Sequence, residues 1–201
     1  MLVMTVDQHA SRLVGDRVDA LVSGFADLAG HAGMVRSFER TVGDEAQAVL
    51  DDHVLAVDVA LRILRGGGWS VGIGVGPVDE PLPESARAGS GEAFVRARAA
   101  VERAKSRQRP VPVAVIGAGE SAGECEAVLT LVGAVVGRRS AAGWAVVDAF
   151  ASLGPAATQA SVAGHLGISQ QAVSQRLRAA MWYEELAVRP VAARLLRDSD
   201  R

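Results

Sequence analysis

The pattern of apolar residues changes once along the chain, and the change separates two parts of different structural class. Up to residue 116, short segments with the two-residue alternation of β-strands recur between helical segments. From residue 140 onward the apolar residues recur only at the spacings of three and four that are typical of helices. The sequence therefore predicts an α+β domain at residues 1–138 and an all-α domain at residues 139–201.

The first part alternates strand and helix signals in a definite order. Strands are predicted at residues 1–5, 35–42, 46–50, 69–78 and 111–116, and helices at 13–25, 54–64, 92–106 and 121–136. Gly43 and Asp44 indicate a hairpin turn. Asp51 or Asp52 is expected to cap the helix that follows, and the glycines at 66–68 are expected to end it. The opening order, β-α-β-β-α-β, is that of a ferredoxin-like fold. We expect a sheet with antiparallel strands and helices packed on one face.

Glycine occupies alternate positions of the fourth predicted strand, at residues 72, 74 and 76. Glycine weakens a strand unless a ligand or another backbone comes close to it. We therefore expect a close approach to one face of this strand.

Composition limits the class of protein. With 49% hydrophobic and 22% charged residues, the chain is too apolar and too weakly charged to be disordered. The longest uncharged apolar run extends only from residue 127 to 137, whereas a membrane span needs about 20 residues. Asp7 precedes any long apolar segment, so no secretory signal is expected and the predicted location is cytoplasmic. The single cysteine, Cys125, excludes an internal disulfide and is expected to be a small buried side chain.

Charge is unevenly distributed over a chain whose net charge is −2. Residues 155–201 hold six arginines and four acidic residues, a net charge of +2, which leaves −4 on the rest. A mildly basic tail on an acidic body suggests two parts with different partners.

The most specific motif is TQASVAGHLGISQQAVSQRLRAA, residues 158–180. Leu166 closes the inner face of a first helix, Gly167 permits a sharp turn, and Ser169 is an N-cap for a second helix. Val173 and Leu177 form the inner face of that second helix. This pattern resembles the DNA-reading helix-turn-helix of many bacterial regulators.

The resemblance implies which residues would face DNA. Glutamine reads adenine, and arginine reads guanine or a phosphate. The expected DNA-binding residues are Thr158, Ser169, Gln170, Gln171, Ser174, Gln175 and Arg178. The alternatives are an ordinary helical hairpin with a solvated polar face and a protein-interaction module, which the modest charge of the tail would suit.

The rest of the tail carries no second motif. His165 is expected to be a partly exposed helix residue, because no second metal ligand lies nearby. No β-wing is expected after residue 180. Trp182, Tyr183, Leu186, Leu195 and Leu196 are interpreted as core or dimer contacts. The partners we expect are double-stranded DNA and, because one reading helix makes few contacts, a second copy of the chain as a homodimer.

Asp7 and Asp44 would lie side by side in a ferredoxin-like sheet. Paired carboxylates suit magnesium and a nucleotide triphosphate, because a small hard cation prefers oxygen ligands. With RTVGDEAQAVL, WSVGIGVGPV and GEAFVRARAAVERAK, the arrangement resembles the class III nucleotide cyclase domain over residues 3–116. The TVDQHASR opening, the GDE turn, the AFVRAR helix and the terminal helix-turn-helix together are most similar to the SatD family.

The departures from an active cyclase argue against an enzyme. In cyclases the helix matching residues 91–105 presents an asparagine and an arginine, and the aligned positions here are Val95 and Ala99. Arg98 is one residue out of register, and no lysine precedes Lys105. A cyclase without donors aimed at the developing charge loses its main stabilisation. We expect no catalytic residues and no obligatory cofactor. The open alternatives are that Asp44 serves the turn and Asp7 caps a helix, or that both form a non-catalytic site for magnesium or a nucleotide effector.

The segment VAVIGAGESAG, residues 113–123, superficially fits the glycine-rich turn of a dinucleotide-binding unit. It lacks an acidic residue at the end of a following strand, and it comes last in its domain. Gly117 and Gly119 are therefore interpreted as turn residues.

Overall fold

The computed structural model describes residues 1–200 and is an α+β fold built on one five-stranded mixed sheet, which confirms the predicted class. The strands are β1 (Leu2–Gln8), β2 (Met34–Arg40), β3 (Glu45–Leu50), β4 (Trp69–Val75) and β5 (Val113–Ile116). Their order in the sheet is β2-β3-β1-β4-β5. β1 is antiparallel to β3 and β4, β2 is antiparallel to β3, and β5 is parallel to β4.

The helices follow the predicted order with shifted ends. They are α1 (Ser11–Val14), α2 (Val18–Gly24), α3 (His53–Gly66), α4 (Glu92–Ala104), α5 (Ser121–Arg138), α6 (Ala141–Leu153), α7 (Gln159–Leu166), α8 (Gln170–Ala179) and α9 (Trp182–Asp198), with short 3-10 turns at Ala26–Leu28 and Ala86–Ala88. The single helix predicted at 13–25 is two, because Gly15 turns the chain at a φ of 82°. Asp52 caps α3 as predicted, accepting hydrogen bonds from the backbone N–H groups of Val54 and Leu55.

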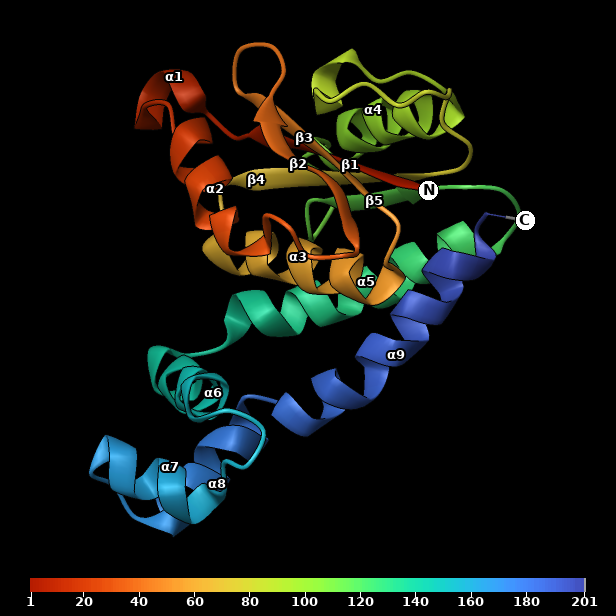
Figure 1. Ribbon diagram of the computed structural model, residues 1–201. Coiled ribbons are helices and arrows are strands. Elements are labelled where there is room, and N and C mark those ends of the chain that lie inside the picture. Colours follow the sequence, from red (N-terminus) through yellow and green to blue (C-terminus); the bar gives the residue numbers. More distant parts are fainter. Residues whose placement is uncertain (201) are drawn as a thin grey trace.

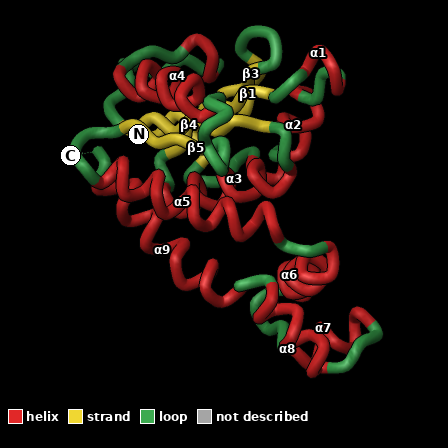
Figure 2. Tube along the Cα trace, turned by 180° about the vertical axis from the view of Figure 1, so that it is seen from behind, coloured by secondary structure: helices red, strands yellow, loops and turns green. Residues whose placement is uncertain are grey.

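Helices cover both faces of the sheet, so the prediction of one covered face is wrong (Figures 1 and 2). α4 packs on one face, mainly against β4, while α3 and α5 lie on the other. The chain must cross a face of the sheet to join the parallel neighbours β4 and β5, and α4 lies in that crossing.

The glycines of β4 explain how α4 comes so close. A Cβ atom on Gly72 would lie 2.2 Å from the backbone nitrogen of Val101, and one on Gly74 would lie 2.2 Å from that of Ala97. The approach expected at this strand is therefore made by a helix backbone.

Two apolar cores lie at the two ends of α9. The main core joins the sheet, α3 and α5, and it includes Leu195 and Leu196 from the C-terminal half of α9. A second core joins α6, α7 and α8, and Trp182 at the start of α9 packs against it. In both views α6, α7 and α8 lie apart from the sheet, and α5 and α9 make the connection (Figures 1 and 2).

A network of charged side chains holds this junction. Arg139 and Glu185 form a fully buried ion pair, and Arg139 also donates to the carbonyl of Ala180 at 2.8 Å. Its Nη1 atom has no hydrogen-bond partner in residues 1–200 and lies in a guanidinium stacked 4.3 Å from the centre of the Trp144 ring. Arg65 of α3 forms an ion pair with Asp148 of α6 at 2.6 Å. This pair links α3, which packs on the sheet, to the group of helices α6, α7 and α8.

Cys125 is fully buried, as expected of a small apolar side chain. Burial raises the pKa of its thiol to about 12, and the Sγ atom lies 3.5 Å from the carbonyl oxygen of Ala192. The thiol is therefore protonated at neutral pH and packs α5 against α9.

The glycine-rich segment after β5 is a turn, as interpreted. Gly119 has a φ of 66°, and Gly117 lies against the end of α9, where an added Cβ would be 2.6 Å from the carbonyl oxygen of Ser199. That carbonyl accepts a hydrogen bond from the N–H of Ala118 at 2.7 Å. The turn therefore serves to dock the C-terminal end of α9. Among the helices in residues 1–200, none has the length and apolar character that a membrane crossing requires.

Candidate nucleic-acid interface

α7 is a short helix whose two ends are both stabilised. Thr158 and Ser161 form a reciprocal capping box at its start. Gly167 ends it in the left-handed conformation, with φ 65° and ψ 33°, and donates its N–H to carbonyls of the last turn. Only three residues separate the end of α7 from the start of α8 at Gln170.

α8 is anchored by its cap and by two buried side chains. The hydroxyl of Ser169 accepts a hydrogen bond from the N–H of Ala172 at 3.1 Å. Val173 and Leu177 are fully buried in the small core, against which Leu166 and Ile168 also pack. The inner face predicted from their spacing is confirmed.

Most of the polar side chains that the sequence singled out are exposed, and Gln171, Gln175 and Arg178 lie on the face of α8 opposite Val173 and Leu177. Gln170, Gln171, Gln175 and Arg178 are exposed, Ser174 is half-buried, and Thr158 and Ser169 are exposed at the helix starts. All seven lie within α7, α8 and the residues that cap them, at the end of the molecule farthest from the sheet (Figure 1). They therefore lie in one region of the chain, and all but Ser174 are open to solvent.

The electrostatics of this face are neutral to basic. α8 contains no acidic residue, and it ends with Arg176 and Arg178 in its last turn. In the part of the chain that the structure describes, neither arginine takes part in an ion pair, so both charges remain free for an external anion. His165 is exposed on α7, and residues 141–200 contain no strand that would form a wing.

The second candidate site, at Asp7, is built differently from the expectation. Asp7 lies near the end of β1, opposite Glu45 of β3, and its carboxylate is 2.8 Å from the ammonium of Lys105 at the end of α4. Asp7 does not cap a helix, because α1 has no side-chain cap. Burial raises the pKa of Asp7, against the lowering effect of Lys105, and the nearby charge of Asp44 raises it further.

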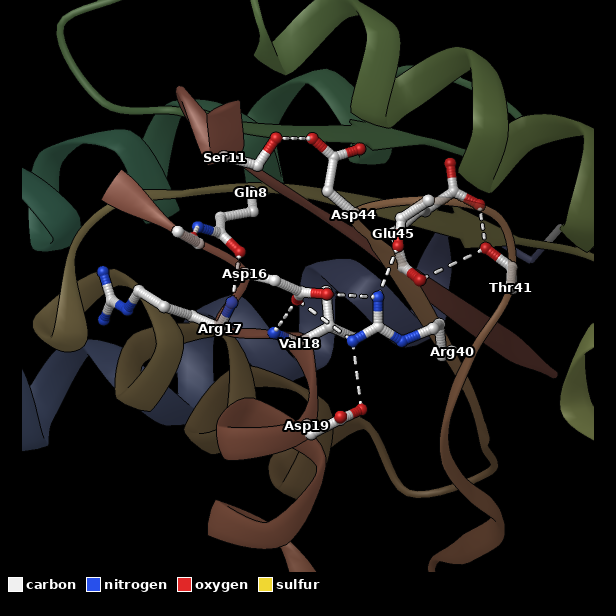
Figure 3. A network of polar contacts seen from close by, with 12 residues as sticks. Gln8, Ser11, Asp16, Arg17, Val18, Asp19, Arg40, Thr41, Asp44 and Glu45 are labelled. Atoms are coloured by element: carbon white, nitrogen blue, oxygen red, sulfur yellow. Dashed lines mark hydrogen bonds and ion pairs between the residues drawn. The ribbon is translucent and has the colours of Figure 1, made fainter. Parts of the chain in front are cut away.

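Asp44 lies in the β2–β3 turn, as the Gly-Asp signal predicted. Its carboxylate accepts a hydrogen bond from the hydroxyl of Ser11 at 2.6 Å (Figure 3). Its carbonyl accepts one from the N–H of Gln8 at 3.0 Å. In the same view Arg40 bridges Asp16 and Asp19, at 2.8 and 3.0 Å, and so ties the hairpin to the start of α2. The contacts of Asp44 thus stabilise the turn.

These residues do not fit a magnesium ion. A cation between Asp7 and Asp44 would have to displace Lys105 from Asp7, and Lys105 is also held by Glu102 at 2.8 Å. Within residues 1–200, no three His, Cys, Asp or Glu side chains are grouped so that they could hold a metal. Sequence reasoning missed Lys105 as the partner of Asp7. The available signal was that Lys105 is the only lysine in the chain.

A cleft of about 550 Å³ lies beside this region, between the β2–β3 turn and α4. Arg98 and Arg87 line it together with Glu45, Ser90 and Val95. Val95 and Arg98 are both exposed on α4. The cleft therefore offers two guanidinium groups beside one buried carboxylate.

Comparisons with protein-family models, with curated proteins and with solved structures find no match to this chain.

Proposed function

We propose that the chain is a DNA-binding transcriptional regulator that acts as a homodimer in the cytoplasm. The observation that carries the proposal is the two-sided character of α8, in which Val173 and Leu177 are fully buried and Gln171, Gln175 and Arg178 are exposed on the other side. A helix anchored in this way presents a rigid polar face that fits the major groove.

The position of each polar residue suggests its role. Gln170 and Gln171 lie in the first turn of α8, which would enter the groove and contact base edges. Arg178 lies in the last turn, where an unpaired guanidinium suits a phosphate. Thr158 and Ser169 stand at helix starts, where backbone N–H groups favour anions.

For the N-terminal part we propose a ferredoxin-like domain related to nucleotide cyclases and to the SatD family, without catalytic activity. The strand order β2-β3-β1-β4, with antiparallel neighbours, supports the ferredoxin-like assignment. The ion pair between Lys105 and Asp7 supports the loss of metal-dependent chemistry. The role of this N-terminal domain would be dimerisation, ligand sensing or both.

A second candidate function is nucleotide binding without turnover. The cleft that Arg87 and Arg98 line favours it, because guanidinium groups bind phosphates in a bidentate manner. In this reading the nucleotide is an effector of DNA binding. The alternative is an enzyme. If the protein formed a cyclic product from ATP or GTP with magnesium, and Asp44→Ala abolished that activity, the enzyme hypothesis would replace the effector hypothesis.

The test is a titration of the full-length protein against its own upstream DNA at two salt concentrations, with and without nucleotide and magnesium. We expect binding that weakens steeply with salt, and weaker binding by Gln171→Ala and Arg178→Ala with unchanged circular dichroism. Wild-type affinity in both variants would contradict the proposed interface. Weak binding to every duplex would favour the protein-interaction module.

A further inference from the structure

α9 has apolar side chains on two opposite faces. One face is buried in the main core through Ala192, Leu195 and Leu196. A second set of side chains recurs at spacings of three and four and is open to solvent: Tyr183 at 50%, Leu186 at 42% and Val191 at 39% exposure, with Ala187 and Pro190 also exposed. We name this set the α9 stripe. A helix that is apolar on both sides is normally covered on both sides, so the stripe indicates a contact surface.

The charges at the ends of the α9 stripe are arranged to complement themselves. Glu184 is exposed near the N-terminal end of α9, and Arg194 is exposed near the C-terminal end, where its guanidinium also lies 3.5 Å from Asp198 of the same helix. When two copies of a helix pack antiparallel about a two-fold axis near residue 189, position 184 of each faces position 194 of the other. The same register brings Ala187 of each copy opposite Val191 of the other, with Leu186 and Pro190 beside this pair. Both the apolar and the charged contacts are therefore satisfied by a second copy of the same helix.

We infer that the α9 stripe is the dimer interface, and that two chains pair through antiparallel α9 helices. This inference builds on the homodimer in the proposed function and names its surface. At a rise of 1.5 Å per residue, the first residues of the two α9 helices would lie roughly 20 Å apart along the axis. The two α8 helices would lie beyond those points, related by two-fold symmetry, as DNA half-sites about 34 Å apart require.

One pair of helices buries less than the roughly 1,200–2,000 Å² of a standard interface, so the free dimer should be weak. We expect a dissociation constant in the micromolar range, measured by sedimentation equilibrium of the full chain without DNA. Leu186→Glu should raise that constant by about tenfold or more, because it places two like charges in the apolar centre. Leu13→Glu is the matched control, since Leu13 is 88% exposed on α1, at the opposite side of the molecule from α9 (Figure 1).

A charge exchange makes the test specific for this register. Glu184→Arg and Arg194→Glu each place like charges opposite one another in a homodimer, so each alone should dimerise less than the wild type. An equal mixture of the two variants should dimerise at least as well as the wild type, because each chain then meets its opposite charge in the other.

A monomeric wild type throughout the micromolar range would overturn the inference. Disruption by Leu13→Glu but not by Leu186→Glu would also overturn it, because it would place the interface on α1. A mixture that dimerises no better than its components would overturn it as well. Since no DNA is present, a failed interface and a failed DNA-binding function give separate results.

Discussion

The ammonium of Lys105 lies 2.8 Å from the carboxylate of Asp7 and joins the end of α4 to the end of β1. The Asp7 side chain is only 14% exposed, so its negative charge is largely removed from water and depends on this partner. The ion pair stands where the resemblance to cyclases implied a metal ion. It gives α4 a fixed electrostatic link to the sheet that the apolar pattern alone does not reveal.

Lys105→Met should therefore destabilise the folded chain at neutral pH. We expect a loss of about 1–2 kcal/mol in the free energy of unfolding, because a mostly buried carboxylate loses its hydrogen-bonded charge partner. Urea denaturation at pH 7 measures it, and Lys105→Arg is the charge-preserving control. Equal stability of Lys105→Met and wild type would show that Asp7 is satisfied by solvent.

The same substitution should raise the pKa of Asp7 further. Burial already holds this pKa above 3.8, and Lys105 opposes the rise. Because the folded-state pKa exceeds the unfolded one, the folded chain binds more protons at Asp7 between the two values. The contribution of Asp7 to the free energy of unfolding therefore falls as the pH rises from the unfolded-state pKa to the folded-state pKa. Removal of Lys105 raises the folded-state pKa and so widens this pH range. Carboxyl-carbon NMR titration of wild type and Lys105→Met follows this pKa directly, with Asp7→Asn assigning the signal. An unchanged or lowered pKa would be inconsistent with the ion pair.

The glycines of β4 should tolerate no methyl group. Gly74→Ala should cost about 3 kcal/mol or more, because a Cβ there would lie 2.2 Å from backbone atoms of α4, which cannot move without displacing the helix. Gly123→Ala in α5 is the control, since nothing lies within 4 Å of its Cβ position. It should stabilise the chain by about 0.5–1 kcal/mol through helix propensity. Thermal unfolding of the two variants compares them. Similar melting temperatures would mean that α4 is loosely packed.

Local signals were sufficient to predict most elements of the fold. Asp52 at a helix start, Gly43 and Asp44 in a hairpin turn, and Gly167 before a capping Ser169 each act through the backbone within a few residues. Such signals do not depend on tertiary contacts, which is why they can be recognised in the sequence.

The errors concern relationships between distant segments. The alternating glycines of β4 indicated a close approach, yet the pattern could not identify α4 as the approaching element and so left one face of the sheet uncovered in the prediction. Likewise, Lys105 and Asp7 are distant in sequence, and only the fold brings them together. The exposure of one side of α9 could not be predicted for the same reason. Tyr183 and Leu195 both have large apolar side chains, and only the packing of the folded chain determines which of the two is buried.

The buried pair of Arg139 and Glu185 should be the most sensitive point of the junction. Glu185→Leu leaves the fully buried guanidinium without its carboxylate and should cost about 3–5 kcal/mol. Glu84→Leu, at an exposed loop position, should change stability by less than about 0.5 kcal/mol. The double variant Arg139→Met with Glu185→Leu should cost less than the sum of its single changes, since no unpaired charge remains. Denaturant titration of the wild type, the single variants Arg139→Met and Glu185→Leu, and the double variant gives the coupling energy. Strict additivity would show that the two side chains do not interact.

Arg178 and Gln171 should affect DNA binding in different ways. If Arg178 contacts a phosphate, Arg178→Ala weakens binding to every duplex and reduces the slope of log affinity against log salt by about one. Gln171→Ala should leave that slope unchanged and reduce the preference for the specific site by about 1–3 kcal/mol, because base-edge contacts carry the specificity. Arg107→Ala, which removes an exposed arginine after α4, is the charge-matched control and should change neither quantity. Fluorescence anisotropy with specific and scrambled duplexes at several salt concentrations separates the two effects. A slope reduced equally by Arg107→Ala and Arg178→Ala would mean that α8 contributes only to the overall charge, and that the polar face above Val173 and Leu177 does not read DNA.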